Sequence, residues 1–340
     1  MSTRSTRRHA VAALAVAGAL LLGGCAGTAP SGSGASAGSS APVTIDTMYG
    51  EVTIPSAPQR VATWGWGATD AVLALGVMPV AIPDDRYGAP DTGITPWVQD
   101  ALDEVGGPAP VLLDASGDLP VEQLLATDPD VLIAPYSGIT QEEYDAVTAA
   151  GIPVVAPAEA LWATPWRDVI TETGEALGLQ DEAAALVQDL DDQVTAAADA
   201  HPEFQGTTIA FATADTDTIY LYLPADARVE ILENLGFVSA PSVEALDKGE
   251  STFYTTVSPE NLDQVDAQVV FSYGFADDAA LTAFETTSPT NLIPAVAKGA
   301  VAAIVGITES DAVSPTALTL PYILPTMVDQ LAAATAVAKG

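Results

Sequence analysis

Basic residues and histidine are scarce in this chain. Its 340 residues include 10 Lys and Arg and 2 His against 45 Asp and Glu, which gives a net charge of −35 at pH 7. Such a surface repels nucleic acid and anionic lipid headgroups, so we exclude both as partners. A site for a bare transition-metal ion normally recruits several imidazoles, and beyond the N-terminal segment the sequence holds only His201. We therefore expect neither a resident metal nor another cofactor.

Cysteine is absent except at position 25, so disulfides contribute nothing to the stability of the fold. The cysteine follows three arginines within the first eight residues and an apolar run over residues 10–22. A membrane-spanning helix needs roughly 20 apolar residues, and this run is shorter. The pattern predicts a secretion signal over residues 1–24.

The end of this segment, Leu22-Gly23-Gly24-Cys25, resembles the bacterial lipobox. The resemblance implies that Cys25 is acylated and becomes the first residue of the mature protein. The alternative is an ordinary cleaved signal with an incidental cysteine. The small and polar residues that follow bury too little surface to fold, so we expect a flexible tether there. Residues 25–42 are thus assigned to the lipidated cysteine and this tether.

Short apolar segments, helical segments and tight loops alternate from residue 58 onward. This alternation predicts a parallel sheet with helices on its faces. We assign residues 43–165 to a first α/β lobe. Its expected strands lie at residues 60–63, 77–82, 111–113, 131–134 and 154–156.

No proline interrupts residues 166–200, where apolar residues recur at helical spacing. One long or once-broken helix, bent near Gly178, is expected in a connector over residues 166–202. Residues 203–340 form a second α/β lobe, which we expect to end in a helix over residues 322–337. The predicted fold class is thus α/β, with two lobes, each a short, mainly parallel sheet flanked by helices, joined by one long helix. The other expected elements of the second lobe are a hairpin at residues 208–221, a helix at 228–235, and strands at 268–272 and 300–305.

A sequence pattern that occurs twice in the chain supports two lobes of similar build. Glu122 precedes the apolar run 131–133, and Glu260 precedes the run 269–271 at the same interval. These and other segments together resemble the ferric-siderophore and cobalamin solute-binding proteins of ABC importers, over nearly all of the chain beyond the signal. The remaining segments that carry the resemblance are Pro58-Gln59-Arg60-Val61 and residues 70–80, 128–133, 150–154, 235–237 and 258–262. The chain departs from the family pattern at Val61-Ala62 and at Gln268.

This resemblance implies a monomeric binding protein, lipid-anchored at the outer face of the cell membrane, that passes its ligand to an ABC-importer permease. It also implies that Glu122 and Glu260 dock on arginines of the permease. The alternative is that each glutamate only stabilises its own helix, because a carboxylate near a helix N-terminus interacts favourably with the helix dipole by about 0.3–1 kcal/mol.

Ligand contacts are expected from loops at the C-terminal ends of parallel strands, where open α/β sheets form crevices. The competing interpretations are core packing for the aromatic residues and charge balance for the arginines. Guanidinium groups also suit the clustered oxygens of a ferric chelate. The predicted ligand-binding residues are Trp64, Trp66, Arg86, Tyr87, Tyr136 and Trp162 in the first lobe, with Arg228 and Tyr273 in the second.

The resulting hypothesis is a binding protein without catalytic residues that captures a ferric siderophore between its lobes. Haem or a corrinoid is the closest alternative ligand. A surface-displayed lipoprotein hydrolase is the alternative from another class, and its serine triad would have to recruit His201. Asp84 and Asp85 lack the wider ligand spacing of an EF-hand, so we interpret them as solvated turn residues.

Overall fold

A computed structural model describes residues 41–215 and 218–340 of the chain. The predicted signal, Cys25 and all but the last two residues of the predicted tether lie outside these ranges. None of the helices in the described residues is long and apolar enough to cross a membrane.

The first lobe contains a five-stranded sheet in which every pairing is parallel. Its central strands are mainly apolar runs because they are buried on both faces, and all three residues of Val131–Ile133 are 0% exposed. In spatial order the strands are β5 (Val111–Leu113), β4 (Ala81–Pro83), β3 (Val61–Thr63), β6 (Val131–Ile133) and β7 (Val154–Val155). The helices between them are α1 (Ala68–Ala74), α2 (Pro96–Val105), α3 (Val121–Ala126) and α4 (Gln141–Ala149).

An antiparallel hairpin precedes this sheet and was not expected from the sequence. It consists of β1 (Val43–Thr47) and β2 (Gly50–Ile54). Ile45, Val52 and Ile54 are buried, whereas their neighbours along each strand are exposed, so the hairpin covers the lobe with one apolar face.

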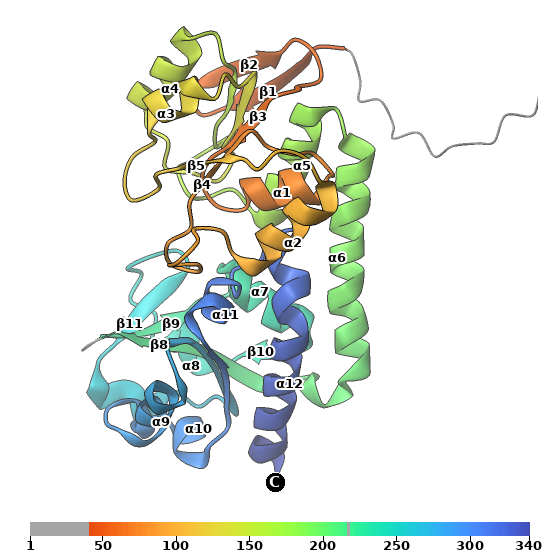
Figure 1. Ribbon diagram of the computed structural model, residues 1–340. Coiled ribbons are helices and arrows are strands. Elements are labelled where there is room, and N and C mark those ends of the chain that lie inside the picture. Colours follow the sequence, from red (N-terminus) through yellow and green to blue (C-terminus); the bar gives the residue numbers. More distant parts are fainter. Residues whose placement is uncertain (1–40, 216–217) are drawn as a thin grey trace, which may run out of the picture. The chain divides into compact units, whose positions relative to one another are not determined.

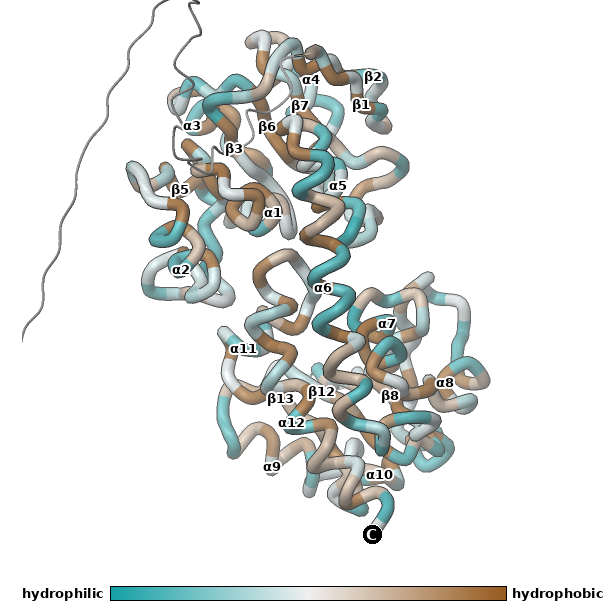
Figure 2. The backbone as a smooth tube through the Cα atoms, turned by 90° about the vertical axis from the view of Figure 1, so that its right-hand side faces the viewer, coloured by the Kyte–Doolittle hydropathy of each residue, from teal (hydrophilic) through white to brown (hydrophobic). Residues whose placement is uncertain are grey.

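The stretch expected to be a connector contains two helices, α5 (Trp166–Leu177) and α6 (Gln180–Ala200). Gly178 separates them in the left-handed conformation at φ 72°, which glycine adopts without steric cost. The first of these helices packs against α1 and β1, so it belongs structurally to the first lobe. The second is the long helix that leads to the second lobe, and Figure 2 shows hydrophilic residues along much of it.

The second lobe contains a mixed sheet, in which three strand pairs are parallel and two are antiparallel. Its main path runs β11 (Tyr254–Val257), β9 (Thr218–Tyr222), β8 (Thr208–Asp215), β12 (Val269–Phe275) and β13 (Val301–Val305), while β10 (Val238–Ser239) pairs with β8. The helical segments are η1 (Pro202–Phe204), α7 (Ala227–Asn234), α8 (Pro241–Ala245), η2 (Pro259–Gln264), α9 (Asp278–Thr286), η3 (Thr290–Leu292), α10 (Pro294–Lys298), α11 (Ile307–Asp311) and α12 (Thr319–Lys339). The terminal helix α12 lies beside α6 and contacts it (Figure 1). The predicted fold class is confirmed.

The two lobes touch through both apolar and polar contacts. The rings of Trp97 in α2 and Tyr322 in α12 lie 5.1 Å apart. The hydroxyl of Thr308 in α11 donates a hydrogen bond of 2.7 Å to the carbonyl of Gly88 in the first lobe. The largest buried apolar cluster draws side chains from the helices of the first lobe, from α6 and from the second sheet. Helix α2 of the first lobe therefore meets α12, and the loop that contains Gly88 meets α11.

Candidate ligand-binding site

A cavity of about 750 Å³ lies where the loops of the first lobe meet α11. Its walls come from the residues that follow β3, β4, β5, β6 and β7, together with Asp311 of the second lobe. Because the five strands are parallel, their C-terminal ends meet at one edge of the sheet, which is where open α/β sheets form crevices.

Five of the predicted ligand-binding residues line this cavity. They are Trp64, Trp66, Arg86, Tyr87 and Trp162. Trp64 is buried, whereas Tyr87 and Trp162 each keep 54% of their surface exposed. An exposed aromatic ring has apolar surface that a ligand can bury with a gain in free energy. The rings of Tyr87 and Trp162 are therefore available to an incoming ligand.

Trp162 is held at the cavity by an unusual backbone conformation. Its φ is +56°, a left-handed value that tryptophan rarely adopts. Its N–H donates to the carbonyl of Ser137 at 3.2 Å, and its ring packs directly on Gly138, where an added Cβ would approach the indole Nε1 to 2.6 Å. The surrounding chain thus fixes an exposed indole at some cost in local strain.

A second glycine holds the loop after β3 close to the loop after β6. Gly65 separates Trp64 from Trp66 and has φ +82°, and an added Cβ would lie 2.4 Å from the carbonyl oxygen of Tyr136. The N–H of Trp66 donates to that same carbonyl at 2.9 Å. Only glycine permits this close approach of the two loops, which positions both tryptophans.

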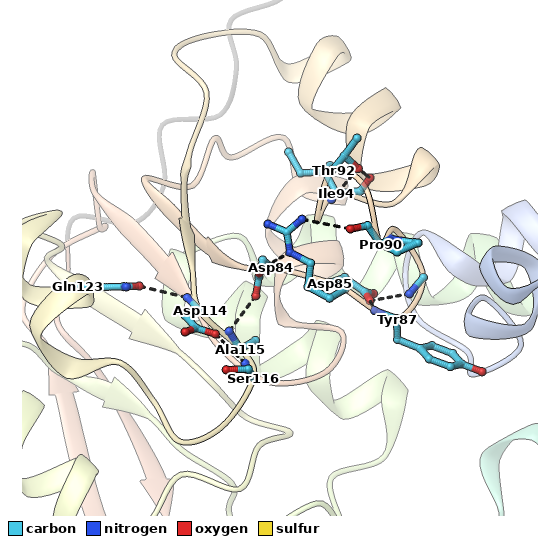
Figure 3. A network of polar contacts seen from close by, with 12 residues as sticks. Asp84, Asp85, Tyr87, Pro90, Thr92, Ile94, Asp114, Ala115, Ser116 and Gln123 are labelled. Carbon is cyan, nitrogen blue, oxygen red and sulfur yellow. Dashed lines mark hydrogen bonds and ion pairs between the residues drawn. The ribbon is translucent and has the colours of Figure 1, made fainter.

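Arg86 lines the cavity but already has a carboxylate partner. Its Nε donates to Asp84 Oδ2 at 2.7 Å, and the other oxygen of Asp84 accepts from the N–H of Ala115 at 2.8 Å (Figure 3). Asp85 accepts from the N–H groups of Tyr87 and Gly88 at 3.0 and 2.8 Å. Both aspartates therefore stabilise loops and form part of the cavity wall, but the side chain of Asp84 is only 12% exposed, so the prediction of a solvated turn residue is wrong there.

The two second-lobe residues predicted to bind ligand, Arg228 and Tyr273, form a separate cluster. Arg228 makes a two-point ion pair with Asp226, with hydrogen bonds of 2.9 and 2.7 Å, and donates to the hydroxyl of Tyr273 at 2.6 Å. Its guanidinium also lies 4.3 Å from the ring of Tyr222. Burial opposes the charge on Arg228, yet the hydrogen bonds to Asp226 raise its pKa above the usual value. For Tyr273, burial disfavours the ionised form and so raises the pKa.

Tyr136, the remaining predicted residue, lies between these two groups. Its ring meets the edge of Trp162 at 5.7 Å, and Arg228 and Asp226 are close enough to act on its ionisation. Burial is the largest cause of its raised pKa. Tyr136 is the structural link between the cavity and the Arg228 cluster.

A buried carboxyl group at the contact between the lobes was not singled out from the sequence. Asp311 ends α11 and is 6% exposed, and its Oδ2 receives no hydrogen bond from a donor within the described residues. Burial, followed by the nearby Asp85, raises its pKa to about 8. Two facing carboxyl groups can approach in this way when one of them holds a proton.

Asp70 in α1 is buried close to this pair. It accepts a hydrogen bond from the hydroxyl of Thr316, which comes from the second lobe. Burial raises the pKa of Asp70 to about 6 despite this hydrogen bond. The burial that changes the pKa of Asp311 arises from contact with residues more than 200 positions away, such as Gly88.

The proposed docking glutamates are both exposed at the first turn of short helical segments, Glu122 in α3 and Glu260 in η2. Neither side chain caps its own helix by a hydrogen bond. Their carboxylates are thus accessible to a partner.

His201 lies outside the cavity. Its Nδ1 is 2.8 Å from Glu203 Oε1, and its ring stacks on Phe204 at 4.8 Å, next to the end of α6. It offers no catalytic base to the cavity. Arg167, at the start of α5, instead joins helices, with ion pairs of 2.7 Å to Asp191 in α6 and 2.6 Å to Glu230 in α7.

Comparison with known proteins agrees with this architecture. Residues 61–306 match the periplasmic binding protein family, and the chain belongs to this family. It is 27% identical over 230 residues to the probable siderophore-binding lipoprotein YfiY of Bacillus subtilis, covering 67% of each chain.

Two solved structures share this fold. The chain is similar to PiaA of Streptococcus pneumoniae in complex with ferrichrome, with 32% identity, 87% of this chain and 99% of that chain covered, and a TM-score of 0.77. A periplasmic solute-binding protein of Mycobacterium smegmatis shares the fold, with 23% identity, 86% and 99% coverage and a TM-score of 0.74. The predicted membership of the siderophore-binding class of ABC-importer proteins is confirmed.

Proposed function

We propose that this protein captures a ferric siderophore in the cavity between the loops of the first lobe and α11, and delivers it to the permease of an ABC importer. The observation that carries the proposal is the cavity itself, which has about 750 Å³ and an aromatic wall in a chain of the periplasmic binding protein family. YfiY and PiaA, described as siderophore-binding and ferrichrome-bound proteins, support the same ligand class.

The chemistry of the wall fits a chelate that is neither small nor purely polar. Trp66 and Trp162 offer apolar faces to the organic arms of a siderophore, while Trp64 is buried behind them in the core of the first lobe. Capture requires recognition only, without a covalent step. Delivery would use the exposed Glu122 and Glu260, and Cys25 would hold the protein at the outer face of the cell membrane by its lipid.

The experiment that tests the proposal is isolation of the full-length protein from iron-starved native cells, followed by mass spectrometry and iron analysis of the extracted ligand. A ferric chelate bound in near-equal ratio to protein is the expected result. Saturable binding of haem or a corrinoid, with no binding of any ferric chelate, would replace the proposed ligand.

A further inference from the structure

The walls of the cavity are strongly acidic. One guanidinium faces five carboxyl groups there. The carboxyl groups belong to Asp84, Asp85, Asp118, Glu143 and Asp311. The two loops and two helices that supply them converge on one volume, so their charges act on the same ligand.

The arginines do not reverse this charge. Arg86 is paired with Asp84 at 2.7 Å, and Arg228 is paired with Asp226 at 2.7 Å. Each guanidinium is therefore balanced by its own aspartate before any ligand arrives. An anionic ligand would have to compete with these carboxylates for the same donors.

Glu143 and Asp85 are anchored rather than free to turn away. Glu143 accepts hydrogen bonds from the N–H groups of Leu119 and Thr140 at 2.7 and 2.6 Å. Asp85 is fixed by the N–H groups of Tyr87 and Gly88. Burial also keeps a proton on Asp311 to a higher pH than usual, since its pKa is about 8, yet the other four carboxyl groups still outnumber the single guanidinium.

The aromatic part of the wall is compatible with positive charge. Tyr87 and Trp162 are each 54% exposed, and the negative face of an aromatic ring attracts a cation. The net charge of −35 on the chain favours the approach of cations over anions from a distance.

Ferric siderophores differ in charge by the chemistry of their oxygen donors. A hydroxamate carries one negative charge, so three of them neutralise ferric iron, and a further amine makes the chelate cationic. Three doubly charged catecholates leave the chelate with three negative charges. Like charges in a cavity partly shielded from water repel more strongly than they do in bulk water.

We propose that the acidic wall selects the ligand by charge, so that neutral and cationic ferric trihydroxamates bind and trianionic ferric tricatecholates are excluded. This inference rests on the proposed function and narrows it to one class of chelate. It assigns Asp118 a role in specificity, because this residue lines the cavity, is exposed, and accepts no hydrogen bond from the described part of the chain.

The test is equilibrium dialysis of the full-length protein in detergent against radio-iron-labelled chelates at low salt. The probes are ferrichrome, which is neutral, ferrioxamine B, which is cationic, and a ferric tricatecholate. We expect the tricatecholate to bind at least about 100-fold more weakly than either hydroxamate. High salt should reduce the difference, since it screens the exposed carboxylates.

Asp118→Lys should shift the ratio of affinities toward the tricatecholate by about 10-fold or more. Asp199→Lys is the matched control, because Asp199 is an exposed residue of α6 outside the cavity and the change in net charge is the same. Tricatecholate binding equal to or tighter than ferrichrome binding would overturn the charge selection and leave the siderophore function standing. Failure of every chelate to bind would overturn both.

Discussion

At the scale of single residues, Trp162 combines features that rarely occur together. Its backbone is left-handed at φ +56°, its indole rests on a glycine, and more than half of its surface is exposed. An exposed apolar residue in strained backbone contributes little to stability, so we infer that this geometry serves contact with the ligand.

Replacing Trp162 with alanine should weaken the binding of a ferric trihydroxamate by about 10-fold or more and reduce ligand-induced quenching of tryptophan fluorescence. Gly138→Ala should act in the same direction, because the added methyl would occupy the place of the indole. Affinity is measured by fluorescence titration, with melting temperature as the test of folding.

Leu161→Ala is the matched control for this pair, since Leu161 is the exposed neighbour that does not line the cavity. Normal affinity in both Trp162→Ala and Gly138→Ala would show that the indole does not contact the chelate.

At the scale of elements, the contact of α11 with the loop after β4 links stability to pH. The folded state raises the pKa of Asp311 from an ordinary 3.8 to about 8. The folded protein thus binds this proton more tightly than the unfolded chain, and the stabilisation is complete below about pH 4 and lost as the pH rises through about 8. The free energy of unfolding should fall with pH by up to about 1.4 kcal/mol per pH unit.

Asp311→Asn should remove this dependence, because the amide keeps the shape and cannot ionise. Burial also raises the pKa of Asp70 to about 6 and that of Glu172 to about 7, so these groups dominate at lower pH. The difference in slope between variant and wild type is therefore clearest between about pH 7 and pH 8, measured by urea denaturation. Equal slopes for the two proteins in that range would contradict the assignment.

The strands were the most predictable elements. Val131–Ile133 and Val154–Val155 are apolar runs bounded by turn residues, and burial on both sheet faces is what such runs indicate. The β1–β2 hairpin alternates buried and exposed residues over only five positions per strand. So short an alternation, directly after the predicted tether, is a weak signal for strands, and the hairpin was therefore not predicted.

The candidate site was only partly predictable. Loops after parallel strands follow from topology, which is why five of the predicted residues line one cavity. The pairing of Arg86 with Asp84 depends on how one loop folds, and the burial of Asp311 depends on a contact between lobes. No local sequence pattern predicts the Arg86–Asp84 pairing or the burial of Asp311.

At the scale of the whole molecule, ligand capture and permease docking should be separable. Glu122→Lys with Glu260→Lys should leave melting temperature and chelate affinity nearly unchanged, because exposed charges contribute little to stability. Iron uptake by cells should fall strongly, since each lysine would repel an arginine of the permease. Each single reversal should give a partial defect.

Uptake is measured with radio-iron-labelled chelate in cells that depend on this protein. Normal transport by the double variant would mean that the glutamates do not dock. Loss of folding or of chelate affinity would assign them to the structure of the lobes instead. Asp199→Lys again provides a charge-matched control on an exposed surface.

Anchoring is a separate property of the molecule. Cys25→Ser should abolish acylation and release the protein into the medium or leave it unprocessed, because Cys25 is the only cysteine in the chain. Fractionation without detergent, followed by detection of the protein in membrane and soluble fractions, measures the change. Unaltered membrane association of the variant would rule out lipidation as the anchor.

The largest apolar cluster draws on both lobes, with Trp97 and Ile170 from the first and Phe211 and Leu331 from the second. The second sheet and helices of the first lobe thus share one buried core, so loss of packing in the second sheet would expose part of the first lobe's interior. Calorimetry should therefore record a single melting transition with equal calorimetric and van't Hoff enthalpies, and two resolved transitions would contradict this. A substitution deep in the second sheet would then lower the temperature at which the tryptophan-lined loops of the first lobe lose their order, although it touches none of them.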